Sequence, residues 1–287
     1  MGFQQYSSYL GAIAFALSLE VVSFSLVIPP LRAQPITAQP IEISLRFPQS
    51  QDIGAPARTG GGGQRGPTAC LKGDLPLTAL TPTNNGVKTI LKNPSFYLYV
   101  PKTKASSAEF IVVNDNGDPV YSTILSLQNT PGTIQVNLPD QVTLTPGNKY
   151  TWHFAVICNP INRDRDEYVR GLILPTTLDL LSEEVRQKTG EGLTREQKEI
   201  LNPSELKKNL AQLKTNPQEA KQRLLNQAQE YSKVGVWSET ITIFTQLSQA
   251  FPDDCNLANE QQELLNSVNL KEISQEIESN SCRSNSQ

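Results

Sequence analysis

The stretch Leu144–Cys158 (LTPGNKYTWHFAVIC) constrains the fold of this chain more than any other segment. Its Pro146-Gly147 pair predicts a turn, because proline presets φ and glycine tolerates positive φ. Beyond the turn, large apolar residues alternate with polar or small ones, which predicts a strand with one buried face. The apolar positions are Tyr150, Trp152, Phe154 and Val156. We therefore expect this strand to lie at the centre of a β-rich domain.

The pattern Leu-x-Pro-Gly-x-x-Tyr-x-Trp resembles the corner of fibronectin- or immunoglobulin-like sandwiches, where a tyrosine hydroxyl bonds to backbone a few residues upstream. We predict such a bond for Tyr150. Other short apolar runs within residues 70–174 are separated by turn-forming residues, which favours a β-sandwich over a parallel sheet. The predicted strands are Leu75–Leu80, Val87–Leu91, Ser95–Val100, Ala108–Val113, Pro119–Ser126, Thr133–Leu138, Lys149–Cys158 and Glu167–Leu174.

Residues 175–280 place apolar side chains at three- and four-residue spacing, which predicts a helical domain before a polar tail at 281–287. Thr177–Lys188 begins it, and Asn202-Pro203 and Asn216-Pro217 predict further helix starts. A last helix is expected within Gln261–Glu278. The predicted fold class is therefore α+β, mainly β.

One helical segment, Ala220–Asp254, has the spacing of a single tetratricopeptide-like hairpin. Gly235 should end its first helix, and Trp237 should open the second and pack on Tyr231. A single unit cannot bury its own apolar face, so we expect it to lean on neighbouring helices and on the sandwich. Tyr97 and Tyr99 share one face of a strand and could bind a flat ligand, but packing against the helices is the favoured interpretation.

The N-terminal part predicts export and a tether. Residues 1–33 resemble a signal peptide with a cleavage position at Ala33, although no basic residue precedes the apolar run and Glu20 interrupts it. An uncleaved anchor and a cytosolic amphipathic helix are the alternatives. Residues 34–69 predict a disordered Pro/Gly-rich linker, and its glycines lack the context of a nucleotide site. Within it, Ile41–Phe47 alternates and could add an edge strand.

Four cysteines are an even number, compatible with two disulfides in an oxidising compartment. Cys70 precedes the first strand and Cys158 ends a late one, so a bond between them is the favoured prediction; two separate thiols are the alternative. Cys255 and Cys282 could form a second pair.

The residues predict little chemistry. A net charge of −3 gives no electrostatic footprint for nucleic acid. The only histidine, His153, lies mid-strand, and no G-x-S-x-G turn or closely spaced Cys/His pair supports hydrolysis or zinc binding. In the loop after Cys158, the residues Arg163, Asp164, Arg165 and Asp166 alternate in charge. A solvated ion-pair turn is the favoured interpretation, ahead of partner recognition and of a metal site.

Several motifs together resemble the cyanobacterial family called domain of unknown function 928. They are GGGGQRGPTAC, LTALTPTNNG, PSFYLYVP, AEFIVVNDNGDPVYST, PGTIQVNLP, GNKYTWHFAVICNP and YSKVGVWSETITIFTQL, which run in order from about Gly60 to Leu270. The resemblance implies an exported protein with a β-sandwich, a helical tail and no assigned activity. Two features depart from the family: the Arg/Asp-rich turn after Cys158, and the lack of a tryptophan before Gln262–Leu270.

We therefore expect a non-enzymatic binding module, periplasmic or extracellular, that recognises a protein partner without a cofactor or metal. Contact with a membrane would be limited to export or to an uncleaved anchor. A structural envelope component or assembly chaperone that pairs through a strand edge is the alternative. A hydrolase is a third hypothesis, but it needs a polar cleft that the sequence does not show.

Overall fold

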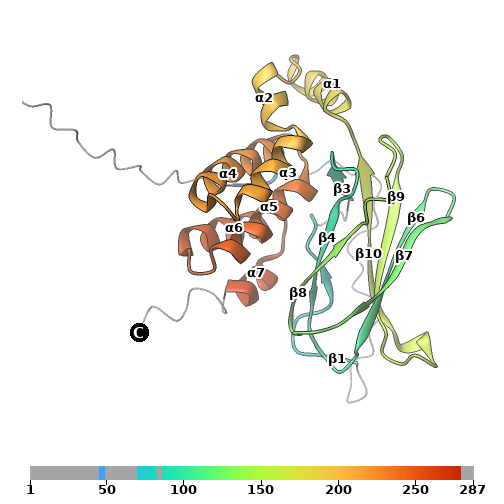
Figure 1. Cartoon of the computed structure of the whole chain (residues 1–287). Coiled ribbons are helices and arrows are strands. Elements are labelled where there is room, and N and C mark those ends of the chain that lie inside the picture. Colours follow the sequence, from blue (N-terminus) through green and yellow to red (C-terminus); the bar gives the residue numbers. More distant parts are fainter. Residues whose placement is uncertain (1–44, 49–69, 83–85, 279–287) are drawn as a thin grey trace, which may run out of the picture. The chain divides into compact units, whose positions relative to one another are not determined.

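The computed structural model describes residues 45–48, 70–82 and 86–278 (Figure 1). They form an α+β structure, as predicted, with 39% helix and 26% strand. Helix outweighs strand, so the expectation of a mainly β chain is wrong. Helix predominates because residues 178–278 are almost continuously helical. In the strand-containing part, many residues lie in the connections between strands.

The strands form two larger sheets and one short pair. Their order is β3-β10-β9-β6-β7 in the large sheet, β2-β4-β8 in the small sheet, and β1-β5 in the pair. The bounds are β1 Leu71–Lys72, β2 Thr78–Ala79, β3 Gly86–Thr89, β4 Ser95–Val100, β5 Lys102–Thr103, β6 Ser107–Asn114, β7 Pro119–Ser126, β8 Gly132–Asn137, β9 Tyr150–Val156 and β10 Glu167–Pro175. β3 pairs with β10 in parallel, and all other pairings are antiparallel.

The first predicted strand is shorter than expected, because only Thr78–Ala79 of Leu75–Leu80 pairs. Ser95–Val100 and Pro119–Ser126 are present with the predicted bounds, and the other predicted strands are present with shifted ends. The parallel pairing of β3 with β10 had no sequence signal, since paired residues such as Gly86 and Leu172 lie far apart in the chain.

Aromatic side chains join the two sheets. Phe96 of β4 contacts Phe110 of β6 and Trp152 of β9, with ring centroids 4.9 and 5.7 Å apart. All three side chains are buried. Because successive side chains of a strand point to opposite faces, this contact fixes which face of each strand is internal.

The predicted tyrosine bond at the start of β9 is present. The backbone N–H of Thr145 donates to the Tyr150 hydroxyl at 3.0 Å, and the ring is buried. Gly147 supplies the positive φ (+85°) that the preceding turn requires. This bond fixes the path by which the chain enters the central strand.

Seven α-helices follow the strands in the described residues. They are α1 Leu178–Thr189, α2 Arg195–Ile200, α3 Pro203–Gln212, α4 Pro217–Lys233, α5 Trp237–Ala250, α6 Cys255–Ser267 and α7 Lys271–Glu278, with a 3₁₀ turn, η1, at Arg163–Arg165. The predicted starts at Asn202 and Asn216 are present, each followed by proline in the first turn. Gly235 (φ +74°) lies between α4 and α5, as expected.

Helix α5 holds the helices against the sheets. It contacts β3 and β4. The indole Nε1 of Trp237 donates to the carbonyl of Leu80 at 2.8 Å. Tyr97 is buried on the face of β4 that also carries the neighbouring Gln135 of β8, and Gln246 of α5 donates to Gln135 at 3.4 Å. The packing expected for Tyr97 is therefore present.

A buried carboxylate strengthens this junction. Glu239 of α5 is fully buried, and its Oε1 accepts from the Thr89 hydroxyl (2.6 Å) and from the backbone N–H groups of Ile90 and Leu91 (both 2.9 Å). These donors follow directly on β3, where the backbone leaves the sheet. One side chain of α5 thus satisfies the end of an edge strand.

The linker prediction is wrong for Leu45–Pro48. Leu45 and Phe47 are buried, and the Phe47 ring meets Trp237 edge to face at 4.9 Å. The segment forms no strand, so the edge-strand expectation is also wrong for these residues. The rest of the predicted linker, the whole predicted signal peptide with Ala33, the residues from 279 onward and Cys282 lie outside the described residues.

Candidate functional site

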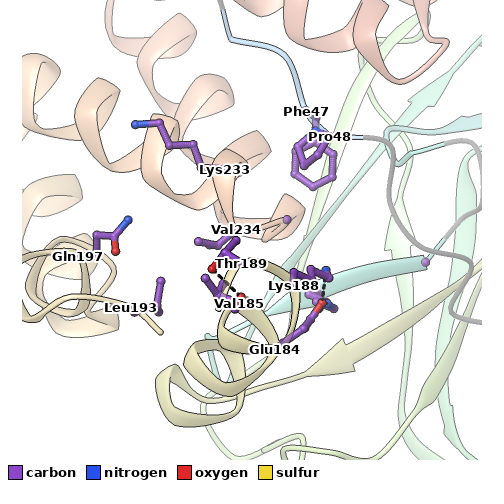
Figure 2. Close-up of a pocket in the computed structure, with 13 residues that line it drawn as sticks. Phe47, Pro48, Glu184, Val185, Lys188, Thr189, Leu193, Gln197, Lys233 and Val234 are labelled. Atoms are coloured by element: carbon purple, nitrogen blue, oxygen red, sulfur yellow. Dashed lines mark hydrogen bonds and ion pairs between the residues drawn. The ribbon is translucent and has the colours of Figure 1, made fainter. Parts of the chain in front are cut away.

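A cavity of about 480 Å³ lies where five parts of the chain meet (Figure 2). This volume is in the range of small-molecule sites. Phe47 and Pro48 form one wall, and α1 forms another. The lining residues are Phe47, Pro48, Gly86, Lys88, Glu184, Val185, Lys188, Thr189, Leu193, Gln197, Lys233, Val234 and Gly235.

The cavity carries more positive than negative charge. Glu184 accepts from Lys88 at 2.5 Å and from Lys188 at 2.7 Å, and Lys233 pairs with Glu230 at 2.6 Å. Burial by itself would raise the pKa of Glu184, but the hydrogen bonds from Lys188 and Lys88 outweigh it and lower that pKa. Glu184 therefore stays ionised, and the two lysines that share it leave one positive charge for an anionic group.

A second feature is the outward side of the large sheet. Residues directly opposite each other in neighbouring strands point to the same face. Two rows cross four strands on the side away from Phe110 and Phe154. We call this surface the outer face; it consists of Ile124, Glu109, Ala155 and Tyr168 in one row and Ser122, Ile111, His153 and Arg170 in the next.

The outer face exposes large apolar side chains. Ile124 is 67% exposed and Tyr168 45% exposed. His153 lies in the second row, away from the cavity. Its pKa is lowered by burial first and by the charge of Arg170 second, so it is neutral at pH 7. This surface therefore combines exposed apolar side chains with charged ones, among them Glu109, which pairs with Arg163.

At the edge of the outer face, strand β7 has few of the features that prevent pairing with another strand. Within the described residues β7 (PVYSTILS) borders only β6, and it contains no charged residue. Natural proteins usually blunt such an edge with lysine, proline or a bulge. Here Pro119 begins the strand and a bulge lies at Val112/Val113 of β6. Along the rest of β7, no strand of the described part of the chain pairs with its second edge.

In the charged loop after Cys158, Arg163 and Asp166 form an ion pair with each other. The Arg163 guanidinium hydrogen-bonds Asp166 and reaches Glu109 of the outer face at 3.0 Å. The hydrogen bond to Asp166 is the main reason that the pKa of Arg163 is raised. Asp164 and Arg165 are exposed. Two of the four predicted residues therefore brace the loop, and two are available for contact.

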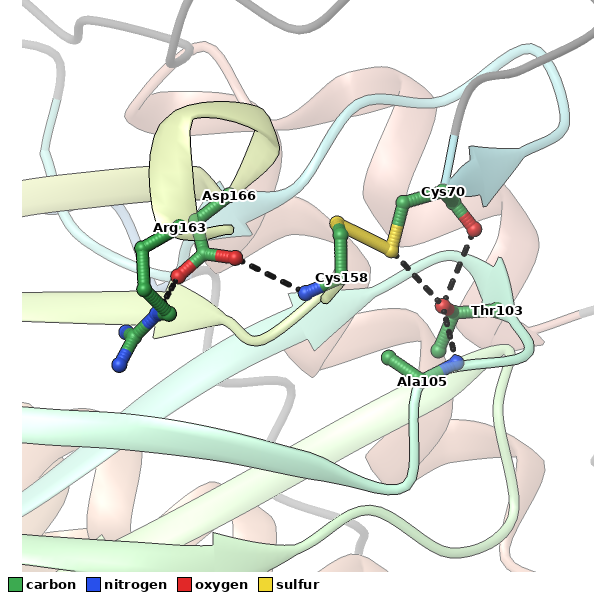
Figure 3. Close-up of a disulfide and its surroundings, with 6 residues drawn as sticks. All are labelled: Cys70, Thr103, Ala105, Cys158, Arg163 and Asp166. Atoms are coloured by element: carbon green, nitrogen blue, oxygen red, sulfur yellow. Dashed lines mark hydrogen bonds and ion pairs between the residues drawn. A yellow bond between two sulfur atoms is a disulfide. The ribbon is translucent and has the colours of Figure 1, made fainter. Parts of the chain in front are cut away.

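The predicted disulfide between Cys70 and Cys158 is present, with Cα atoms 5.5 Å apart (Figure 3). Asp166 accepts from the backbone N–H of Cys158 at 2.9 Å, so the loop and the disulfide support each other. Thr103 donates to the carbonyl of Cys70 at 3.1 Å. Cys255 is not a free thiol, but its predicted partner Cys282 is outside the described residues, so that pairing stays a prediction.

Comparison with known protein families identifies the family of this chain. A model of the family described as Domain of Unknown Function (DUF928) matches residues 60–277. The chain belongs to the DUF928 family. A search of curated proteins finds no match. The DUF928 match contains the cavity's lysines, the outer face and the disulfide, but it begins after Leu45–Pro48.

The described residues contain no group of three His, Cys, Asp or Glu side chains that could hold a metal ion. No helix in this part of the chain is long and apolar enough to cross a membrane.

Sequence reasoning missed the cavity and the burial of Leu45 and Phe47. The alternation in Ile41–Phe47 was the available signal, but it was interpreted as a possible strand. The convergence of Lys88 and Lys188 on Glu184 has no local signal, because 96 residues separate Lys88 from Glu184.

Proposed function

We propose that this protein is an exported, non-enzymatic interaction module that binds a protein partner through its outer face. The observation that carries the proposal is the exposure of Ile124 and Tyr168 in one row, while α5 covers the small sheet. Burying exposed apolar side chains of this size is what stabilises most protein interfaces. Asp164 and Arg165, in the loop that Arg163 ties to Glu109, would contact the rim of the same partner.

An immunoglobulin-like interpretation of residues 70–175 supports this. The order β10-β9-β6-β7 corresponds to strands G-F-C-C′ of such domains, and β2-β4-β8 corresponds to A-B-E. Tyr150 occupies the tyrosine-corner position. Trp152, two residues later, contacts Phe96 of β4, so an aromatic pair replaces the usual disulfide between strands B and F. The inference from fold to binding is analogy, and the outer face supplies the specific argument.

The helical part fits a tetratricopeptide-like hairpin, formed by α4 and α5 around Gly235. A single hairpin needs neighbours to bury its apolar face. Contacts of α3 with α4, of α6 with α5, and of α5 with β3 supply them here. In this interpretation the helical part packs on the small sheet and on β3 at one edge of the large sheet, which leaves the outer face free to bind.

The Cys70–Cys158 disulfide supports export, because such bonds persist mainly in oxidising compartments. The absence of catalysis is proposed because the only histidine lies on the outer face and not in the cavity. In the cavity, Glu184 accepts from two lysines and its pKa is lowered, which makes it a weak general base.

The test compares two sets of exposed positions. Ile124→Glu combined with Tyr168→Glu places charge on the outer face, and Leu180→Glu changes a similarly exposed apolar residue of α1 (52%). On native gels of envelope extracts, the wild-type chain and the Leu180 variant should migrate in a larger complex, and the double variant should migrate alone. Equal migration of all three would contradict the proposal.

A second candidate is an envelope structural component or chaperone that pairs through β7. The uncharged edge of β7 favours it. It predicts that the purified chain self-associates and that Ile124→Lys abolishes this in sedimentation velocity. A wild-type chain that sediments only as a monomer would exclude self-pairing.

A further inference from the structure

The segment Leu45–Pro48 lies on the helices in the way a bound peptide does. Leu45 is 2% exposed and Phe47 4%, whereas Arg46 and Pro48 between and beyond them are exposed. Alternate side chains of an extended peptide bind in this manner, with pockets giving specificity and backbone bonds giving affinity.

Two backbone groups of this segment form hydrogen bonds with side chains of the helices. The N–H of Phe47 donates to the hydroxyl of Ser267 in α6 at 3.0 Å. The hydroxyl of Ser232 in α4 donates to the carbonyl of Arg46 at 3.3 Å. The Phe47 ring packs on Trp237 at the start of α5. Three helices thus form a groove, which we define by Ser232, Trp237 and Ser267.

The family model covers the residues of the groove but not the segment that occupies it. The match to the DUF928 model covers residues 60–277 and contains all three groove residues, but it begins after Leu45–Pro48. In the sequence, 21 residues separate Pro48 from Cys70. The occupant is therefore attached to the domain through a chain segment and is not one of its helices or strands.

The 480 Å³ cavity lies next to this segment. Phe47 and Pro48 form one of its walls, and Lys88, Lys188 and Lys233 with Glu184 supply its charges. In the sequence, Pro48 is followed by the uncharged Gln49-Ser50-Gln51, and the first acidic residue is Asp52, four positions after the proline. A competing segment with acidic residues directly after the proline would gain attraction to these lysines.

We propose that α4, α5 and α6 form a peptide-binding groove, and that Leu45–Pro48 occupies it as a tethered ligand which a partner protein displaces. The partner presents an extended apolar-x-apolar-Pro segment followed by acidic residues. This site is separate from the outer face, so the proposal stands or falls independently of the proposed function. Tethering gives the internal segment an effective concentration on the order of millimolar, which masks the groove from weak free peptides.

The experiment measures binding of a fluorescent peptide, EISLRFPQSQ, to the full chain by anisotropy. The variant Leu45→Ser with Phe47→Ser empties the groove, and it should bind the peptide roughly tenfold or more tightly than the wild type does. A peptide in which Asp replaces the Gln and Ser after the proline should bind more tightly still. Adding Ser267→Ala to the emptied variant should weaken binding, whereas adding Ser204→Ala, an exposed serine of α3, should not.

Equal binding to the wild type and the emptied variant, or no binding to an emptied variant that still unfolds cooperatively, would overturn the proposal. If the emptied variant does not fold, a protease site inserted between Pro48 and Cys70 replaces it. After cleavage, the segment should dissociate and the labelled peptide should bind; retention of the segment would overturn the proposal. A wild-type dimer that becomes monomeric when the groove is emptied would assign the groove to a second copy and refute the tethered assignment.

Discussion

Replacing Glu239 tests the junction between the helices and the large sheet. Its Oε1 accepts three hydrogen bonds, from the Thr89 hydroxyl and from the N–H groups of Ile90 and Leu91. Glu239→Ala removes the acceptor of the Ile90 N–H, at a cost of about 1–3 kcal/mol. The Leu91 N–H keeps the Thr89 hydroxyl as an acceptor at 3.1 Å, and that hydroxyl lies 3.5 Å from the Leu91 carbonyl, so these two donors lose less. The free energy of unfolding should therefore fall by roughly 2–4 kcal/mol. That is a large part of the stability of an ordinary domain.

The pH dependence of the same site has a definite sign. Burial is the main cause that raises the pKa of Glu239 above its usual value of 4.5. A group with a raised folded-state pKa contributes its full stability below the unfolded pKa and loses it as pH rises through the folded pKa. Glu239→Gln cannot ionise but keeps a carbonyl acceptor. The wild type should therefore lose stability relative to Glu239→Gln as the pH increases above about 4.5.

Urea unfolding followed by tryptophan fluorescence measures both effects, because Trp237 lies two residues from Glu239. Glu183→Ala is the control: its carboxylate is exposed on α1, and its pKa is lowered to about 2, chiefly by a hydrogen bond from Arg186. This control should leave the midpoint near that of the wild type at pH 7. An Ala variant at position 239 that loses less than about 1 kcal/mol, or a difference from Glu239→Gln that is flat with pH, would refute the reasoning.

Three further predictions concern the strands. Replacing both Cys70 and Cys158 by serine should lower the free energy of unfolding by about 4–5 kcal/mol, since the bond closes a loop of 88 residues; no difference between reduced and oxidised wild type in urea would contradict this. Tyr150→Phe removes the bond from Thr145 and should cost about 1 kcal/mol in the same assay, whereas Tyr168→Phe on the outer face should cost nothing measurable. Gly171→Ala places a Cβ 2.5 Å from Cζ2 of Trp152 and should destabilise by about 1–3 kcal/mol, and an unchanged thermal midpoint would show that the Trp152 ring is placed differently.

Local patterns predicted what local chemistry determines. The bond of Tyr150 to Thr145 spans five residues, and Gly235 ends a helix through its own backbone conformation, so both could be inferred from sequence. The Cys70–Cys158 bond was inferred from strand positions and compartment. The packing of Tyr97 toward the helices could be predicted because its strand carries large side chains on both faces.

Distant contacts were not predictable in the same way. The hydrogen bond from the Trp237 indole to the carbonyl of Leu80 joins residues 157 positions apart, so no local pattern indicates it. The buried Glu239 had the appearance of a solvated helix residue, because its donors belong to a strand end. Phe47 belongs to a stretch whose composition is typical of a linker. It is buried because it packs in the groove around Trp237.

The central claim, that the outer face binds a protein partner, is tested most directly by crosslinking in the source organism. A photoreactive amino acid replaces Ile124 in one strain and Leu180 in another, and the two chains are compared after irradiation. We predict a discrete adduct of higher mass from position 124 and none from position 180. Equal adducts from both positions, or none from position 124 in a folded and exported chain, would contradict the account.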